Sequence, residues 1–293
     1  MYEPLKIQAA KAQKGLNGER KLDYHLRMLP STIYSVLNDI SFELRDITFQ
    51  IDACIVSNHA IYLIDSKSID GEAIFSTQLE QLTQKHKNKE RNIKYPLTQL
   101  ESNKFLIMQW LQERSLEGFP IYYFVSIADS TTIIKVIGDE SHIATHVTFA
   151  ENIPFYIKRQ NETLEKRYPN GNPTLKNKIV TQMMQAYKDL KIDYFKKFKI
   201  DISDVQPGVI CKKCYRLETT YLKGKWICQH CHYIDRFAYR RSLEEFFILF
   251  GPSISNKEAR WFLRVPSRVT ITKILQRSNL IYNRQNKRWY KQK

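Results

Sequence analysis

Two acidic residues and a lysine stand at a spacing that could bind a divalent cation. Asp52 lies in the run Ile47–Val56, and Asp65 and Lys67 lie in the run Ala60–Ser68. A three-residue polar turn separates the two runs, which is typical of a β-hairpin. If the strands pair symmetrically about this turn, Asp52 falls opposite Asp65, and Lys67 projects from the same face about 6.5–7 Å further along.

Apolar neighbours make these charges unusual, because they predict strands that are buried on both faces. By the period of two, one face should carry Ile51, Ala53, Ile55, Tyr62 and Ile64. The other should carry Cys54, Val56, Ile61 and Leu63. Opposed carboxylates in such a setting are destabilising unless a cation lies between them.

Carboxylate oxygens of this kind favour Mg²⁺ or Mn²⁺, ions that keep several waters and accept phosphate oxygens. Asp52 and Asp65 would bind the ion, and Lys67 could orient an attacking water or stabilise charge on phosphorus. The competing interpretation is that Asp65 and Lys67 are strand-end residues in solvent and that Asp52 is a carboxylate near a turn.

Four cysteines form a second candidate metal site. They make two Cys-x-x-Cys pairs separated by 13 residues, namely Cys211 with Cys214 and Cys228 with Cys231. This spacing matches tetrahedral Zn²⁺ in a zinc ribbon. The zinc would be structural, because four protein ligands leave no open position for chemistry. A module of about 30 residues buries little core, so the metal would supply much of its folding free energy.

Other interpretations of these cysteines stay open. The run from Cys228 to His232 also fits the attachment pattern of c-type haem, and His230 or His232 could replace one thiolate. A disulfide framework is disfavoured in a reducing compartment. Cys54 lies outside the cluster and is expected to be a buried strand residue.

The surrounding pattern predicts mixed α/β architecture. Residues 5–29 show helical spacing, and Pro96 opens a second helix at the position where its missing N–H costs nothing. Ile121–Ile127 reads as a third strand. Two prolines within residues 168–173 mark the clearest break, and a helix over roughly 174–198 then leads to the cysteines.

The first part of the chain resembles the nuclease-related domain (NERD) family of the PD-(D/E)xK restriction-endonuclease-like superfamily. The resemblance covers roughly residues 10–130 and rests on four short motifs in the family's order. They are Gly15-Leu16-Asn17-Gly18-Glu19, Gln50-Ile51-Asp52, Ile64-Asp65-Ser66-Lys67 and Pro96-Leu97-Thr98-Gln99. The family more often has Glu at the position of Asp65.

The resemblance implies a role for each matching residue. Asp52 and Asp65 would be the ligands of Mg²⁺ or Mn²⁺, and Lys67 the cation that orients water. Glu19 would be an additional ligand or would support one, and Gln99 would lie near the substrate phosphate. Read without the family, Glu19 is a solvated helix carboxylate and Gln99 a helix-surface amide.

Positive charge is concentrated in the last third of the chain. Residues 1–204 carry 27 Lys/Arg against 25 Asp/Glu, a net of +2, whereas residues 205–293 carry 19 against 5, a net of +14. A region this basic attracts polyanions. Ribosomes, DNA, RNA and anionic membranes are all polyanions that this charge could attract. A membrane is disfavoured, because the sequence shows no basic amphipathic helix with a lipid-facing stripe.

The basic region resembles a winged helix-turn-helix. Three short helices are expected, followed by a β-wing around Asn286, and Ser267 is placed to cap the third helix. In such a module this helix enters the major groove of DNA. Its candidate contact residues are Arg268, Thr270 and Lys273.

The sequence therefore predicts an α/β chain with a restriction-endonuclease-like mixed sheet flanked by helices, a small zinc ribbon and a winged-helix-like C-terminal module. The expected segments are a nuclease-like domain (1–168), a linker and helix (169–205), the Cys₄ zinc ribbon (206–235) and the basic helix-turn-helix-like module (236–293).

The function expected from these features is that of a Mg²⁺-dependent nuclease, an endonuclease of PD-(D/E)xK type, with one structural Zn²⁺ and with DNA favoured over RNA as partner. The alternative is an inactive nucleic-acid-binding or regulatory protein on a nuclease fold. No apolar run is long enough to span a membrane and no export signal opens the sequence, so a cytoplasmic location is expected. The oligomeric state stays open, a homodimer included.

Overall fold

The computed structural model describes residues 3–187 and 193–291 and divides the chain into two compact units. Unit 1 is Met1–Leu190 and unit 2 is Lys191–Lys293. Among the described residues, none of the helices is both long and apolar enough to cross a membrane.

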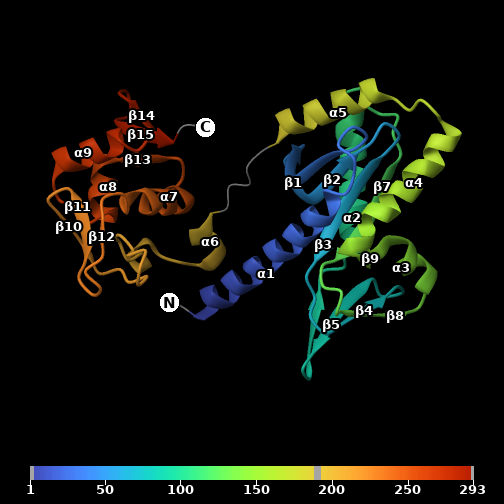
Figure 1. The fold of residues 1–293 in the computed structure, drawn as a ribbon, viewed down its shortest axis with the longest axis horizontal. Coiled ribbons are helices and arrows are strands. Elements are labelled where there is room, and N and C mark those ends of the chain that lie inside the picture. The colour runs from blue at the N-terminus through green and yellow to red at the C-terminus, as the bar shows by residue number, and fades with distance from the viewer. Residues whose placement is uncertain (1–2, 188–192, 292–293) are drawn as a thin grey trace. The chain divides into compact units, whose positions relative to one another are not determined.

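Unit 1 contains two sheets and their covering helices (Figure 1). Its strands are β1 (Ser35–Leu44), β2 (Ile47–Val56), β3 (Ile61–Lys67), β4 (Glu72–Ser76), β5 (Gln81–His86), β6 (Lys89–Ile93), β7 (Ile121–Ile127), β8 (Ile133–Ile137) and β9 (Val147–Phe149). Its helices are α1 (Glu3–Leu26), α2 (Pro96–Gln112), α3 (Glu140–His146), the 3₁₀ turn η1 (Ala150–Asn152), α4 (Ile153–Arg167) and α5 (Pro173–Ala186).

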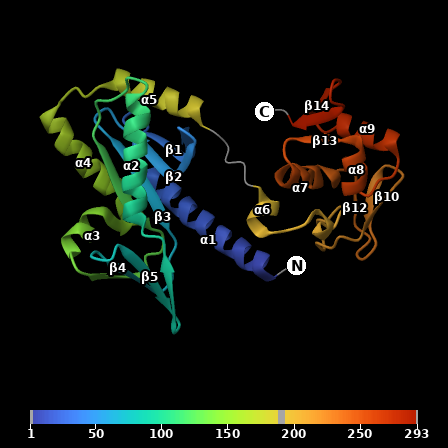
Figure 2. The same cartoon turned by 180° about the vertical axis from the view of Figure 1, so that it is seen from behind.

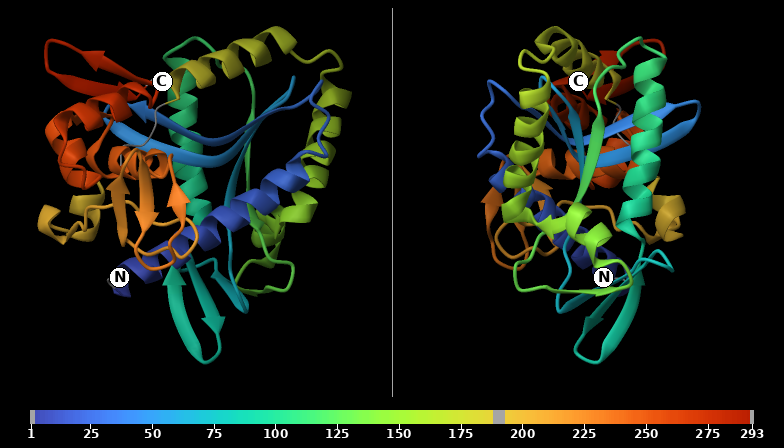
Figure 3. Two further views of the ribbon diagram at one scale, coloured as in Figure 1. Left: turned by 60° about the vertical axis from the view of Figure 1, so that its left-hand side comes forward. Right: turned by 90° about the vertical axis from the view of Figure 1, so that its right-hand side faces the viewer.

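The larger sheet is mixed, as the sequence predicted. Its order is β1-β2-β3-β7-β9, with antiparallel pairs from β1 to β3 and parallel pairs from β3 to β9. Helices cover both faces (Figure 3): α1 and α4 pack on one side, and α2 and α5 on the other. Viewed from behind, α2 crosses in front of the strands (Figure 2). Both faces of β3 are therefore buried, which explains its continuous apolar run.

The hairpin of β2 and β3 forms with the predicted register. Ala53 pairs with Ile64 and Val56 with Ile61, so the next pair in line would be Asp52 and Asp65. The ladder ends one pair earlier, at Ala53 and Ile64. Beyond this point the N–H of Ser66 donates to a side chain of β2 rather than to its backbone: it donates to Oδ2 of Asp52 at 2.7 Å. The carboxylate thus takes the place of a ladder hydrogen bond where the two strands separate.

The prediction of which β2 side chains lie on the same face of the sheet is wrong for Ile51. Ile51 packs with Cys54 on the side of α2, whereas Ala53 packs on the side of α1. The β1–β2 ladder skips Asp39, which has a left-handed φ of +50°, between the pairs Asn38↔Ala53 and Ile40↔Ile51. This break in the alternation shifts the residues before Asp52 to the other face.

The smaller sheet, of order β6-β5-β4-β8, was not predicted. Its β5 and β6 form an antiparallel hairpin that projects beyond the larger sheet (Figure 1). Lys87 and Asn88 at the turn have φ values of +47° and +59°, the left-handed pair that a tight hairpin turn requires. The buried side chains of Phe75 and Leu82 anchor this sheet in the core that lies against α2.

Helix α5 belongs to the core of unit 1. Ile179 and Met183 are fully buried in the same cluster as the α2 face of the sheet. The sequence placed this helix in a connecting segment and extended it to about residue 198. The described helix ends at Ala186, a separate short helix occupies Tyr194–Phe198, and residues 188–192 of the expected helix lie outside the described residues.

Unit 2 joins a three-stranded ribbon to a helical module. The elements are α6 (Tyr194–Phe198), the 3₁₀ turn η2 (Ile202–Asp204), β10 (Thr219–Leu222), β11 (Lys225–Cys228), β12 (Ile234–Asp235), α7 (Tyr239–Phe250), β13 (Ser253–Ser255), α8 (Asn256–Phe262), α9 (Arg268–Gln276), β14 (Leu280–Asn283) and β15 (Arg288–Lys291). The third sheet has the order β13-β15-β14, and β14 and β15 form the short antiparallel hairpin that was expected around Asn286.

One hydrophobic core serves both parts of unit 2. Trp226 of the ribbon is 2% exposed, and its ring lies 5.4 Å from that of Tyr239 on α7. Val209, just before the first cysteine pair, belongs to the same cluster as Ile271 and Trp289 of the helical module. The ribbon and the module therefore depend on each other for burial.

Candidate active site and zinc site

Four of the predicted site residues converge at the end of β3 where it separates from β2. Lys67 donates from Nζ to Oδ1 of Asp65 at 2.9 Å, and the same Nζ lies 2.7 Å from Oδ2. Asp52 approaches from β2 and is held by the N–H of Ser66. Glu19 comes from α1 and interacts electrostatically with all three.

A glycine lets α1 come this close to the sheet. A Cβ on Gly18 would lie 3.2 Å from Cβ of Ser68 and 3.3 Å from Cβ of Ala128, tighter than ordinary carbon contacts. Gly18 is buried in the middle of a helix, where glycine costs about 1 kcal/mol relative to alanine. The close approach offsets that cost by bringing the next residue, Glu19, toward the strand ends.

We predict that Gly18→Ala lowers the free energy of unfolding by about 1–3 kcal/mol, the usual cost of an extra methyl group in a packed contact. Urea unfolding monitored by circular dichroism measures it. Gly15→Ala is the matched control, because a Cβ there meets nothing within 4 Å, so only the gain in helix propensity, up to about 1 kcal/mol, is expected. Equal stability of the two variants would contradict the close approach.

The site holds more negative charge than it neutralises internally. Burial, together with the charge of Asp52, raises the pKa of Asp65 to about 6 against the opposing effect of Lys67. Burial likewise raises the pKa of Asp52, opposed by the N–H of Ser66 and by Lys67. The pKa of Glu19 is raised by burial and by the neighbouring carboxylates. A divalent cation would relieve this repulsion.

The donor set fits a hard divalent cation. Oδ2 of Asp65 is buried and accepts no hydrogen bond, although the charged Nζ of Lys67 lies 2.7 Å away, so a metal could still bind this oxygen. The side chain of Asp65 is only 5% exposed, and carboxylate oxygens suit Mg²⁺ or Mn²⁺. The carboxylate oxygens of Glu19, Asp52 and Asp65 lie further apart than the sulfurs of the four cysteines in unit 2, which are the one compact ligand group among the described residues.

Comparison with known protein families agrees with this geometry. Residues 14–128 match the family model of the nuclease-related domain. Over these residues the chain is similar to a nuclease-related domain. The match includes Glu19, Asp52, Asp65 and Lys67, and it extends to the loop after β7. No curated protein matches the chain, and no solved structure does either.

One predicted residue of the nuclease-related domain stands apart from the other four. Gln99 is half-buried in the first turn of α2, where its backbone N–H donates to the carbonyl of Tyr95 at 3.4 Å. Its side chain has no hydrogen bond to any described residue. Lys94, at the entry to this helix, does interact electrostatically with Asp65. Lys94 was not among the predicted site residues, although it stands two residues before Pro96, where the predicted helix begins.

A second missed residue of the nuclease-related domain is Asp39. Its charge raises the pKa of both Glu19 and Asp52. Gln50, from the Gln-Ile-Asp motif, donates a hydrogen bond from Nε2 to Oδ1 of Asp39. The buried Asn103 of α2 donates to the Gln50 carbonyl at 3.0 Å, so the helix fixes this part of β2. Nothing in the sequence around Asp39 distinguished it from a loop aspartate.

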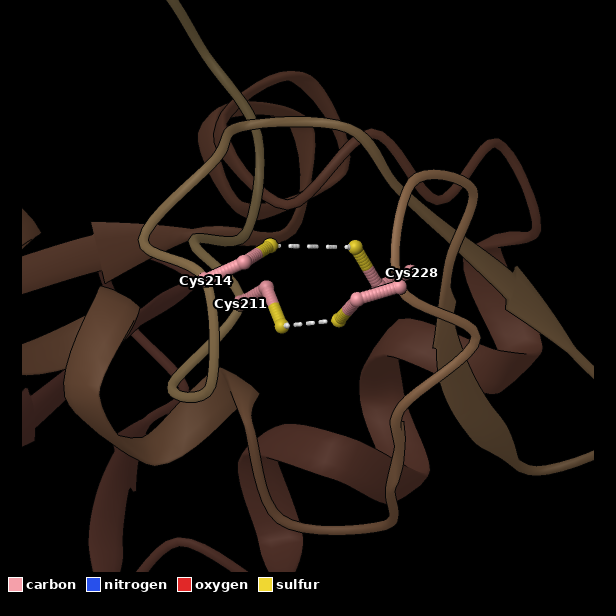
Figure 4. Close-up of side chains that lie close together, drawn as sticks. Cys211, Cys214 and Cys228 are labelled. Atoms are coloured by element: carbon pink, nitrogen blue, oxygen red, sulfur yellow. Dashed lines mark hydrogen bonds between the residues drawn. The ribbon is translucent and has the colours of Figure 1, made fainter.

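Outside the nuclease-related domain, the four cysteines meet as the spacing predicted. Their sulfurs all lie within 4.8 Å of one another (Figure 4). The pairs Cys211–Cys231 and Cys214–Cys228 are each 3.6 Å apart between Sγ atoms, far from disulfide length. Tetrahedral zinc with Zn–S bonds of about 2.3 Å holds sulfurs about 3.8 Å apart, so the cluster could hold one Zn²⁺.

Backbone amides prepare one of these thiols for metal binding. The N–H of Cys231, with help from that of His230, lowers the pKa of Cys228 to about 7. A thiolate is the form that binds zinc. All four thiols meet in one cluster, and the alternative ligands His230 and His232 are not part of it.

The three residues expected to read DNA lie on α9 of unit 2. Arg268 and Lys273 are exposed, and Thr270 is half-buried with its hydroxyl donating to Oγ of Ser267 at 3.0 Å. Ser267 caps the helix as predicted, accepting from the N–H of Thr270. The opposite face of α9 is buried in the core of unit 2, so the basic face is presented to solvent.

Proposed function

We propose that this protein is a metal-dependent nuclease of PD-(D/E)xK type that hydrolyses phosphodiester bonds, with DNA the expected substrate. The observation that carries the proposal is the convergence of Glu19, Asp52, Asp65 and Lys67 at the point where β2 and β3 separate. The match to the nuclease-related domain supports the same chemistry.

The metal in this proposal is Mg²⁺ or Mn²⁺. Asp52 and Asp65 would hold it, with Glu19 as a further ligand or as support for one. When bound, the ion would supply electrophilic assistance at the phosphate and a lowered pKa for water. The raised pKa values of both carboxyls and the buried Oδ2 of Asp65, which accepts no hydrogen bond and faces only the charge of Lys67, are the features that support a cation here.

Lys67 would act as the positive group beside the reacting phosphate. Its side chain is 19% exposed, so it is shielded from solvent yet can reach a ligand. It would orient the attacking water and stabilise charge that develops on the phosphate oxygens. Gln99, in the first turn of α2, would place a polar group near the substrate.

Unit 2 would hold the nucleic acid. Residues 205–293 carry a net charge of +14, which favours phosphate contacts. Arg268, Thr270 and Lys273 are assigned to DNA contact, with one structural Zn²⁺ holding the ribbon. Catalysis is thereby assigned to unit 1 and substrate retention to unit 2.

A specific observation favours a second function, that of an inactive nucleic-acid-binding or regulatory protein. Lys67 lies within 2.9 Å of both oxygens of Asp65. This ion pair could replace the cation permanently and leave a nuclease fold without activity.

A cleavage panel separates the two functions. We expect the protein to cleave at least one of duplex DNA, single-stranded DNA or RNA in Mg²⁺ or Mn²⁺ but not in EDTA. Lys67→Gln should slow cleavage about 10²–10³-fold, the usual effect of removing one group that stabilises transition-state charge. Lys166→Gln, an exposed residue of α4, is the control and should cleave like wild type. If Lys67→Gln also matched wild type, this site would not be the catalytic one.

A further inference from the structure

The β5–β6 hairpin concentrates positive charge in a unit that is otherwise slightly acidic. Residues 81–94 contain five Lys or Arg and one Glu. The rest of residues 1–190 contains 18 Lys or Arg against 21 Asp or Glu. The overall charge of unit 1 therefore does not explain why so many of its cations lie on this one hairpin.

The cations of the hairpin are exposed, and two of them, Lys89 and Arg91, share one face, whereas Lys85 pairs with Glu90 on the other. Lys89 and Arg91 alternate with Glu90 on the edge strand β6, and every residue from Lys89 to Asn92 is exposed. Their face continues that of Leu82 and Ile93, which contact the core beneath α2. The hairpin face thus runs from the core near the site to a basic tip at Lys87.

Hydrogen bonds fix the hairpin to the loop that follows β3, the strand of Asp65 and Lys67. Gln84 is 5% exposed; its Nε2 donates to the Asp70 carbonyl at 2.7 Å, and its Oε1 accepts from Nε of Arg91 at 2.7 Å. Asp70 follows Lys67 by three residues and forms an ion pair with Lys14 of α1. Arg91 is therefore connected to the end of β3 through one buried amide.

The other end of the hairpin reaches the same site. Lys94 follows β6 directly and lies close enough to Asp65 to interact with its carboxylate electrostatically. Positive charge consequently extends from the tip of the hairpin to the buried carboxylate. An extended polyanion could follow such a path.

We propose that the β5–β6 hairpin is a nucleic-acid-binding arm of the nuclease-related domain, in which Lys87, Lys89 and Arg91 contact the phosphate backbone beside the Asp65 site. The inference rests on the proposed function, because it takes the substrate of that site to be nucleic acid. It adds a contact surface in unit 1 to the one assigned to unit 2.

Protection of an exposed sheet edge is the simpler explanation for the two cations of β6, Lys89 and Arg91. Charge of either sign protects an edge, and acidic residues outnumber basic ones in the rest of unit 1. Edge protection also does not require a cation at Lys87, which lies in the turn. The presence of cations at both the edge strand and the turn favours binding of an anion.

The test measures binding by the full chain carrying Asp52→Ala, so that the probe is not cleaved. Fluorescence anisotropy with a labelled DNA duplex and the matching single strand would be recorded over a series of KCl concentrations. Lys87→Gln with Lys89→Gln should weaken binding about tenfold at low salt and flatten the slope of log K against log salt by up to about 1.8, about 0.9 for each lost phosphate contact. Arg91 is left in place because it supports Gln84.

The control removes the same charge elsewhere on unit 1. Lys166→Gln with Lys178→Gln, on α4 and α5, should change binding less than twofold. If the hairpin and control variants bind alike at every salt concentration, the arm is overturned. If the hairpin pair lowers the melting temperature, Lys87→Gln alone provides the test, with an expected slope change of about 0.9.

The two proposals fail separately. If the wild-type protein cleaves DNA and the hairpin variant binds as tightly as the control variant, the proposed binding arm is wrong and the proposed nuclease function stands. If the wild-type protein cleaves none of the substrates and only the hairpin variant loses affinity, the proposed binding arm stands and the proposed nuclease function is wrong.

Discussion

Asp52→Asn is expected to abolish cleavage, by at least about 1000-fold, without lowering the stability of the fold. The loss follows because the change removes one of two carboxylates assigned to the cation and its charge. The shape is kept, since the amide oxygen of asparagine can still accept the Ser66 N–H that now bonds Oδ2 of Asp52. Initial cleavage rates in Mg²⁺ measure the first effect.

Stability should be equal to or greater than that of wild type in buffer free of divalent ions. Burial, supported by the charge of Asp39, raises the pKa of Asp52, so its ionised form costs folding free energy. That cost is absent below about pH 4, where the carboxyl is protonated in the unfolded chain too, and it grows as pH rises through the folded pKa. The advantage of Asp52→Asn should therefore be seen near neutral pH and vanish in acid.

The control for this variant is Asp46→Asn. Asp46 lies in the exposed turn between β1 and β2 at φ +66°, a conformation that asparagine tolerates well. It should leave both cleavage and stability unchanged. A marked loss of stability in Asp52→Asn alone would show that the carboxylate is a structural group and would count against the repulsion described at this site.

Cys211→Ser is expected to remove the zinc and to unfold unit 2. Wild type should contain about one equivalent of zinc per chain, and the variant much less, by elemental analysis. Structural zinc contributes on the order of 10 kcal/mol, comparable to the whole stability of a domain. Because Trp226 of the ribbon packs in the core that also holds Trp289, both should become exposed together. A red shift in tryptophan emission reports this.

Cys54→Ala is the matched control for the zinc measurement. Cys54 is fully buried in unit 1 and lies outside the cysteine cluster, as the sequence predicted. It should retain one equivalent of zinc and the emission of a folded unit 2. Zinc content that survives in Cys211→Ser would exclude the proposed ligand set.

The parts of the fold that the sequence revealed are those with strong local signals. The apolar runs and short turn of β2 and β3 gave the correct register, and Pro96 marked the start of α2. The paired Cys-x-x-Cys motifs gave the thiol cluster, since two residues between cysteines allow both sulfurs to face one point. These features depend on residues close together in the chain.

The features that escaped prediction depend on contacts between distant segments or on weak patterns. Strands β5 and β6 are polar and charged, so they carry no alternation of apolar residues. Asp39 joins the site through the pairing of β1 with β2, in which it stands opposite Asp52 at a gap in the ladder. The same interruption moved Ile51 to the other face, which a strict period of two could not anticipate.

The common core of unit 2 limits how its parts could be exchanged between proteins. A ribbon transplanted alone would carry Trp226 into solvent and leave the former neighbours of that indole, Tyr239 among them, uncovered. A transferable cassette would have to extend from about Val209 to Trp289. Recombination, natural or in the laboratory, should succeed at the borders of that span and fail between its cysteines and its helices.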